Sequence, residues 1–410
     1  MRLRSTAILL TLASILVLSA CTSHSNGANP QQEVRIGLLS PLTGRDGPAG
    51  QQATHGAELA ALVINPGGSA PVPLAGRGLP GLGGARIRIV QADTRGDPQH
   101  AVEQAISLAS QQRVAGIIGA DSGDSTAGAS ERTERIGVPF IGAVATADFL
   151  TERGLEWFFR AAPTDSMFAQ AGLDVLQQSR DRGVRRLGIL NAADNASNEA
   201  ATAFRRLAGQ ANDQVAAVAD FASGSSPEQV LPSLSKVRGA KPDAVVGVAT
   251  RQNDARALLA ADQSGGARSV SLVIGPGFTP QAIRQAVSGA DVLHSTAWSL
   301  DFAGRNPVAK AIANLYLQRF KSPMTDVAAE TFTATLALAQ AIDAARSVNP
   351  GLVRTALLGL DVPGSDTVMP WGGIRFDQTG QNTLAAGLVE QVTPTTAHVV
   401  FPAELTAGNT

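Results

Sequence analysis

Cysteine is almost missing from this chain, because Cys21 is the only one among 410 residues. An intramolecular disulfide is therefore excluded. A strong net charge is also missing, since the formal net charge is −1 at pH 7 and the 33 basic side chains are scattered along the chain. Without a basic surface of its own, the protein gives no reason to expect nucleic acid or an acidic membrane as a partner.

The usual combinations of catalytic residues are missing as well. The sequence contains no G-x-S-x-G motif and no cysteine placed as a nucleophile. The histidines lie far apart and lack the spacing of a metal site: they are His24, His55, His100, His294 and His398. We therefore predict a protein that is not an enzyme and that holds no metal or cofactor. Catalysis stays a remote alternative, because distant residues can converge in a fold.

The N-terminus predicts a lipoprotein signal peptide over residues 1–20. A start with two arginines is followed by the apolar run Ala7–Leu18, which is too short for a comfortable membrane span. The sequence Leu-Ser-Ala-Cys that ends at Cys21 matches the bacterial lipobox, which predicts that Cys21 is lipidated after cleavage. Residues 21–33 are polar and predict a flexible tether. We expect an extracytoplasmic protein held at the cell membrane only by the lipid on Cys21.

Strand and helix patterns alternate along most of the chain. Short apolar runs typical of buried strands are followed by apolar positions at helical spacing, over residues 34–151 and again over residues 168–274. Such alternation favours parallel sheets that are covered by helices. Two extended segments without a helix, residues 157–163 and 295–300, are candidate crossovers between the two series. The sequence predicts an α/β fold of two doubly wound parallel-sheet lobes.

We predict that the chain connects these lobes three times. Several connecting segments at one boundary behave as a hinge, and two lobes joined in this way enclose a cleft. The expected boundaries are 34–160 and 298–362 for the first lobe, 161–297 and 363–401 for the second lobe, and 402–410 for a C-terminal tail.

Two polar loops of the first lobe are expected to lie at one edge of its sheet. In open α/β sheets this edge binds small molecules. The first loop begins a helix, where free backbone N–H groups and hydroxyls suit an anion. The second loop offers backbone carbonyls and one hydroxyl. Helix capping by Ser125 or Thr126 and a favourable helix-dipole position for Asp124 are competing interpretations. The candidate ligand-binding residues are Ser122, Gly123, Asp124, Ser125, Val144 and Thr146.

The order of motifs resembles that of extracytoplasmic solute-binding proteins of the type I periplasmic-binding fold. The resemblance is strongest to the branched-chain amino-acid (Leu/Ile/Val) binding proteins of ABC transporters, and it covers nearly the whole mature chain. It implies a small-molecule ligand that is clamped between the lobes by hinge closure and passed to an ABC permease in the membrane. The segments that carry it are Pro41–Gly44, Asp93, Asp97-Pro98, the Gly119 loop, Gly137–Ile141 and Ala145–Ala147.

The resemblance also implies roles for single residues. Thr146 falls on the family's ligand-binding threonine, and Val144 on the position whose backbone carbonyl faces the ligand. Gly123 stands where a serine is usual. In the second lobe, Gly277 stands where amino-acid binders place an acid against the ligand's ammonium group, and Ala196 stands at an aromatic position. The remaining candidates on this wall are Asn195, Arg251, Gln252 and Phe278.

These departures leave the ligand class open. An unpaired buried ammonium group is costly. Either another acid such as Asp124 or Asp194 replaces the lost carboxylate, or the ligand is not a free α-amino acid, which is the interpretation that we favour. Arg251 would suit an anionic ligand. We predict a receptor for a small polar solute, such as an amino acid or amide. A lipoprotein that senses a ligand for a signalling or cell-wall partner is the alternative.

Overall fold

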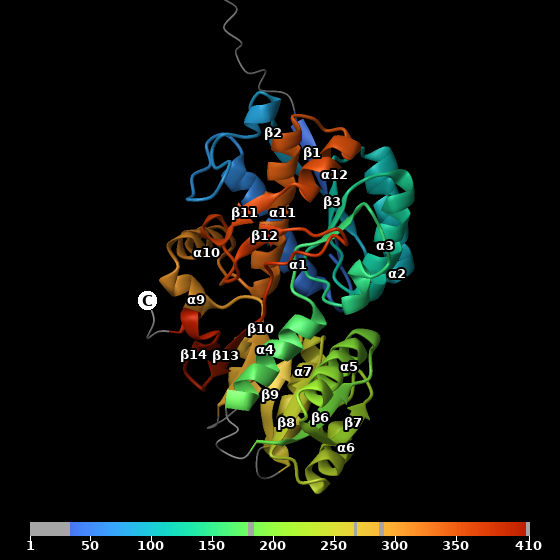
Figure 1. Cartoon of the computed structure of the whole chain (residues 1–410), viewed down its shortest axis with the longest axis vertical. Coiled ribbons are helices and arrows are strands. Elements are labelled where there is room, and N and C mark those ends of the chain that lie inside the picture. The colour runs from blue at the N-terminus through green and yellow to red at the C-terminus, as the bar shows by residue number, and fades with distance from the viewer. Residues whose placement is uncertain (1–32, 179–183, 266–268, 287–290, 407–410) are drawn as a thin grey trace, which may run out of the picture.

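The computed structural model describes residues 33–178, 184–265, 269–286 and 291–406. Two α/β lobes lie one above the other, and the chain runs back and forth between them (Figure 1). The predicted signal peptide and Cys21 lie outside the described residues, as does all of the predicted tether except its last residue, Glu33. Within the described part, no helix is both long enough and apolar enough to span a membrane.

The first lobe is built on a five-stranded parallel sheet with the strand order β2-β1-β3-β4-β5. This order is one of the common doubly wound arrangements. Its inner strands β3 and β4 are fully buried because helices cover both sides of the sheet, whereas the edge strand β2 carries exposed polar residues. The strands are β1 (Glu33–Ser40), β2 (Arg86–Asp93), β3 (Ile117–Ile118), β4 (Phe140–Gly142) and β5 (Phe158–Arg160).

Helices α1 and α11 pack on one face of this sheet, and α2 and α3 pack on the other. The α1–α11 contact is very close, since a Cβ atom at Gly56 would lie 2.3 Å from the carbonyl oxygen of Ala328. The helices of this part of the chain are α1 (Gly47–Ile64), α2 (Pro98–Ile106), α3 (Gly123–Ile136), α10 (Pro307–Phe320), α11 (Asp326–Ala345) and α12 (Pro350–Leu358), with short helical turns at η1 (Pro80–Leu82), η2 (Ser107–Gln111) and η3 (Asp148–Thr151).

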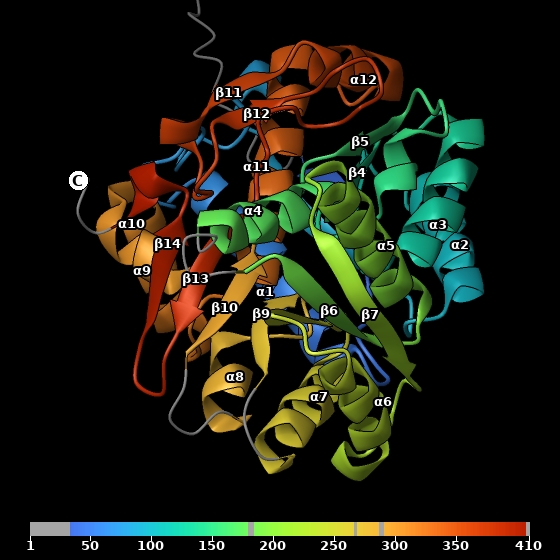
Figure 2. The same ribbon diagram turned by 60° about the horizontal axis from the view of Figure 1, so that its bottom comes forward.

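The second lobe has a seven-stranded sheet with the order β14-β13-β10-β9-β8-β6-β7. Figure 2 shows these strands side by side, with α4 and α5 on one face and α6, α7 and α8 on the other. Strands β6 to β10 are parallel and repeat the strand order of the first lobe, whereas β13 and β14 are antiparallel additions. The strands are β6 (Arg186–Ala192), β7 (Gln214–Phe221), β8 (Ala244–Val248), β9 (Val270–Ile274), β10 (Val292–Thr296), β13 (Leu388–Val392) and β14 (Ala397–Phe401). The helices are α4 (Asp165–Gln178), α5 (Asn195–Gln210), α6 (Pro227–Gly239), α7 (Gln252–Ser264) and α8 (Pro280–Ala286). The predicted α/β fold of two doubly wound lobes is thereby confirmed.

Three segments connect the lobes. The chain leaves the first lobe after β5, leaves the second lobe after β10, and returns to the second lobe before β13. We placed this return at residue 363, but the structure places it after Asn382. The hairpin of β11 (Asp361–Pro363) and β12 (Gly373–Arg375) belongs to the first lobe side, because Asn382 donates to the carbonyl oxygen of Ala161 at 3.1 Å and bonds the backbone of Arg160.

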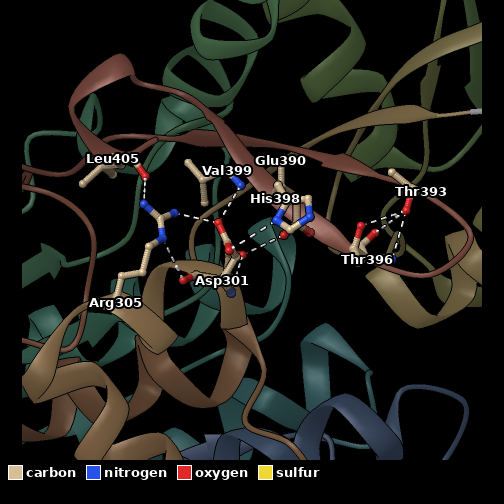
Figure 3. A network of polar contacts seen from close by, with 9 residues as sticks. Asp301, Arg305, Glu390, Thr393, Thr396, His398, Val399 and Leu405 are labelled. Carbon is tan, nitrogen blue, oxygen red and sulfur yellow. Dashed lines mark hydrogen bonds and ion pairs between the residues drawn. The ribbon is translucent and has the colours of Figure 1, made fainter. Parts of the chain in front are cut away.

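A polar network fixes the second connection to the last strands (Figure 3). Asp301, in α9 (Leu300–Arg305), accepts from the backbone N–H of Val399 at 2.9 Å and from Arg305 at 2.6 Å. Behind it, the buried Glu390 of β13 bonds His294 at 2.9 Å and accepts from Ser299 at 2.8 Å. Residues before and after the point where the chain crosses, His294 and Asp301, are therefore both bonded to the last strands of the second lobe.

Candidate functional site

A cavity of about 990 Å³ lies between the two lobes. It is lined by loops that follow the carboxyl ends of strands in both sheets, and helices α1, α3, α5, α7 and α11 begin at its wall. Small molecules bind at this edge of open α/β sheets. We call this cavity the cleft.

The floor of the cleft begins with the loop after β3. Gly119 has a φ of +141°, and a Cβ atom there would lie 2.2 Å from the carbonyl oxygen of Leu39, so only glycine fits. Ser122 caps α3, because its hydroxyl accepts from the N–H of Ser125 at 3.3 Å. Ser122, Gly123 and Asp124 line the cleft, whereas Ser125 is fully buried and does not. The capping interpretation thus describes Ser122 rather than Ser125.

The second loop, after β4, places Val144 and Thr146 on the cleft wall. The Thr146 side chain hydrogen-bonds the carboxyl group of Asp165, and its carbonyl oxygen accepts from the Asp165 N–H at 2.8 Å. Asp165 is 5% exposed and opens α4 just after the first connection. Burial raises the pKa of Asp165 to about 7. The expected ligand-binding threonine is therefore coupled to a buried acid at the hinge.

The second-lobe wall contains Asn195, Arg251 and Gln252, as the sequence predicts. Gly277 and Phe278 do not line the cleft. A Cβ atom at Gly277 would lie 2.6 Å from the carbonyl oxygen of Arg251, so this position cannot carry an acidic side chain without a backbone shift. Phe278 is fully buried in the core of the second lobe.

The aromatic wall that the resemblance implies is not present among the described lining residues. Ala196, where the resemblance implies an aromatic residue, lines the cleft. Phe168 is the only aromatic residue that the described part of the chain contributes to the lining. The cleft therefore offers little surface for stacking a planar ligand.

The two lobes touch at the rim of the cleft. Asn195, at the start of α5, donates to Asp124, at the start of α3, with a distance of 2.9 Å. Arg206 of α5 forms an ion pair with Asp148 of η3 at 3.2 Å. These contacts join the lobes directly, in addition to the three connecting segments.

Acidic residues dominate the charged lining of the cleft. Nine carboxyl groups face two guanidinium groups, those of Arg45 and Arg251. The acids are Asp46, Asp121, Asp124, Asp165, Asp194, Glu199, Asp254, Asp326 and Glu330. So many acids in one enclosed space produce a negative potential that attracts positive charge.

The surroundings of several of these acids raise their pKa, so these carboxyl groups keep a proton up to a higher pH than usual. Burial, reinforced by Asp124, Asp148 and Asp194, raises the pKa of Glu199 to about 7. Burial raises the pKa of Asp121 to about 6. It also raises the pKa of Asp326, and it raises that of Glu330 well above its ordinary value.

Sequence reasoning missed Glu199 and Glu330. Glu199 lies one turn after Asn195 on α5, and Glu330 lies one turn after Asp326 on α11. Residues at i and i+4 share one face of a helix, so both acids follow a residue at the cleft edge of their own helix. That spacing was the available signal. Among the described residues, no group of three or more histidine, cysteine or acidic side chains is placed to hold a metal ion.

Comparison with known proteins identifies the family. Residues 33–395 match the family model described as periplasmic binding protein. The chain belongs to the periplasmic binding protein family. This membership confirms the predicted resemblance, and it confirms a binding protein rather than an enzyme. The match spans both lobes and all three connecting segments.

Individual relatives of this periplasmic binding protein are distant in sequence. Leu/Ile/Val-binding protein homolog 7 of Brucella abortus (strain 2308) is 24% identical over 385 residues, which are 91% of this chain and 92% of the relative. The substrate-binding protein LivJ from Streptococcus pneumoniae, in complex with isoleucine, aligns with a TM-score of 0.71 and 21% identity over 90% of this chain and 100% of its own. A solute-binding protein from R. palustris, in complex with benzoate, has a TM-score of 0.71 and 18% identity over 90% and 95%. These structures confirm the fold.

Proposed function

We propose that the protein is the extracytoplasmic receptor of an ABC importer, which closes its two lobes on a small polar solute and delivers the solute to a membrane permease. The observation that carries this proposal is the enclosed cleft of about 990 Å³ at the carboxyl edges of both sheets. Its volume suits a small molecule. The relatives support the importer assignment, because they include a Leu/Ile/Val-binding protein homolog, an amino-acid transporter substrate-binding protein and a solute-binding protein of an ABC transporter.

The ligand-binding residues that we propose are those of the predicted set that line the cleft. They are Ser122, Gly123, Asp124, Val144, Thr146, Asn195, Arg251 and Gln252. A ligand that contacts both lobes at once shifts the equilibrium of the hinge motion towards the closed conformation. Asn195 and Asp124 already bridge the rim at 2.9 Å, so each lobe presents polar groups to the same enclosed space.

A screen of solutes tests the binding function. We expect a small solute to raise the melting temperature of the purified protein at millimolar concentration, because a ligand that binds only the folded state stabilises it. The panel contains amino acids, short amides, organic acids and polyamines, and the measurement is a thermal shift. If every solute leaves the melting temperature unchanged, the receptor function is contradicted.

We also propose that the lipid on Cys21 anchors the protein on the outer side of the membrane. Replacing Cys21 with serine removes the thiol that accepts the lipid, so we expect Cys21→Ser to move the protein from the membrane fraction to the soluble fraction. Fractionation followed by immunoblotting measures this. Ser19→Ala, at a lipobox position that does not carry the lipid, is the control and should remain in the membrane fraction. Retention of Cys21→Ser in the membrane fraction would contradict the lipid anchor.

A further inference from the structure

Glu199 of the second lobe faces Gly123 of the first lobe across the cleft. Gly123 opens α3, and a Cβ atom built on it would lie 3.3 Å from Oε2 of Glu199, which comes from α5 of the opposite lobe. Because Gly123 has no side chain, the carboxyl group of Glu199 approaches the start of α3 closely. A ligand carboxylate placed here would meet a like charge, which is unfavourable.

Glu330 is a second acid of the cleft, and it comes from a different element. It belongs to α11 and is 6% exposed, yet it contributes to the cleft wall. Its Oε1 atom is buried and has no hydrogen-bond partner among the described residues. Leaving a buried polar atom without a partner costs free energy, and native proteins do so rarely. A donor group on the ligand would supply the missing hydrogen bond.

Three other acids of the cleft already accept hydrogen bonds from the protein. Asp194 accepts from Ser197 and Thr250, and it caps α5. Asp254 accepts from Ser223 at 2.6 Å and from the N–H of Gly224 at 2.7 Å. Asp326 accepts from the N–H of Val327 at 2.9 Å. Glu199 and Glu330 differ from these three acids, because desolvation and neighbouring carboxylates, and no hydrogen bond from a described residue, act on their carboxyl groups.

The arginines of the cleft do not neutralise these two acids. Arg251 donates to the Ser223 hydroxyl at 3.2 Å, and its charge acts on Asp121. The charges that act on both acids are negative: Asp124, Asp148 and Asp194 act on Glu199, and Asp326 acts on Glu330. The described part of the chain therefore supplies no positive partner to Glu199 or Glu330, although a buried acid needs one.

We propose that the cleft binds an organic cation, a solute that carries primary-amine or guanidinium groups, and that Glu199 and Glu330 accept hydrogen bonds from those groups. This inference rests on the proposed receptor function. Charge-assisted hydrogen bonds are roughly twice as strong as neutral ones. The positive groups of such a solute would supply both acids with donors. Gly123 then serves the ligand by leaving room for Glu199.

Isothermal titration calorimetry of the full-length protein tests this proposal. The probes are putrescine, agmatine and spermidine as cations, and leucine, acetamide and benzoate as the comparison set. We expect at least one cation to bind at least tenfold more tightly than any member of the comparison set. Glu199→Gln and Glu330→Gln, tested separately, should each weaken that binding at least tenfold. Glu103→Gln removes one negative charge from exposed α2, away from the cleft, and should leave the affinity unchanged.

The pH dependence of cation affinity is a second measurement, and it would not change if Glu199 had only a structural role. Because the pKa of Glu199 lies near 7 in the ligand-free protein, binding a cation should release protons, and the affinity should rise severalfold from pH 6 to pH 8. Each variant is first checked for an unchanged fold by circular dichroism, and the other variant decides if one does not fold.

The outcomes separate this proposal from the receptor function. Binding of leucine, acetamide or benzoate without binding of the cations would overturn the cation proposal and leave the receptor function intact. Cation binding that survives both Glu199→Gln and Glu330→Gln would also overturn it. If none of the six probes and no solute of the thermal-shift panel binds, both proposals fail together.

Discussion

Replacing Arg160 with methionine is expected to lower the free energy of unfolding by about 3–5 kcal/mol. Arg160 ends β5 at the first connection, and it is 1% exposed. Its guanidinium donates to Gln381 at 2.7 Å, to the carbonyl oxygen of Thr146 at 3.2 Å and to the Thr151 hydroxyl at 3.0 Å, and it also bonds the carbonyl oxygen of Ala147. Methionine fills much of the volume but leaves these buried acceptors without a donor.

Arg160→Lys distinguishes the charge from the shape of the guanidinium. Burial lowers the pKa of Arg160 to about 10, so the group is still charged at neutral pH. Lysine keeps the charge but lacks the planar fork that reaches several acceptors at once. We expect the lysine variant to lose about 2 kcal/mol, less than the methionine variant, because part of the bonding is retained.

Urea unfolding followed by circular dichroism measures both losses. Arg88→Met is the matched control, because Arg88 is exposed on β2 and forms a surface ion pair with Glu33 at 3.3 Å, which is worth only about 0–1 kcal/mol. If Arg160→Met unfolds within about 1 kcal/mol of the unmodified protein, Arg160 does not stabilise the connection in the way its contacts indicate.

The alternation of strands and helices was predictable because each element has its own periodicity. Strand β8 (Ala244–Val248) is apolar throughout, and α11 is a long apolar helix in which every residue from 328 to 339 is buried. The restart of this alternation after β5 predicted a second lobe, and the structure shows the same strand order in both. Local patterns of this kind are strong wherever a segment is buried on one face or on both.

Elements whose structure depends on distant partners were not predictable. Strand β10 contains His294, whose polar ring fits a buried strand only because Glu390 bonds it from β13. The third connection was placed too early for the same reason, since Gln381 and Asn382 look like loop residues in the sequence. They bind Arg160 and Ala161, which lie more than 200 residues earlier.

The candidate site was predictable at the level of loops but not of side chains. Strand ends indicate which loops reach the cleft. The sequence therefore predicts Gly123, Thr146 and Asn195 as candidates, and all three line the cleft. Gly277 and Phe278 follow a strand in the same way, yet they turn away from the cleft, because the chain there packs tightly on the backbone of Arg251. A sequence pattern does not report that direction.

The free energy of unfolding of the ligand-free protein is expected to fall as the pH rises from about 4 to about 7. Burial raises the pKa of Asp165 to about 7 from an ordinary value of 3.8, so the folded protein keeps a proton that the unfolded chain has lost across this range. The folded state therefore binds more protons than the unfolded state, and stability decreases with pH until about pH 7. The contribution of Asp165 is on the order of 2–4 kcal/mol.

Two further buried acids of the cleft act in the same direction. The raised pKa values of Asp326 and Glu330 add to the loss of stability. Asp165→Asn should make the dependence shallower, because asparagine does not titrate. Asp243→Asn is the control. Backbone N–H groups of Arg185 and Arg186 lower the pKa of Asp243, so its contribution to stability changes only below about pH 4, where stability rises with pH.

Urea midpoints at pH 5, 6, 7 and 8 measure this dependence for the unmodified protein and both variants. A cation bound between Glu199 and Glu330 should reverse the trend, because it favours the ionised carboxylates and so binds the folded protein more tightly at high pH. Stability that is constant or rises from pH 5 to pH 8 without ligand would show that the buried acids of the cleft are ionised already. The raised pKa values of Asp165 and Glu330 would then be contradicted, while the fold and the cleft would remain as described.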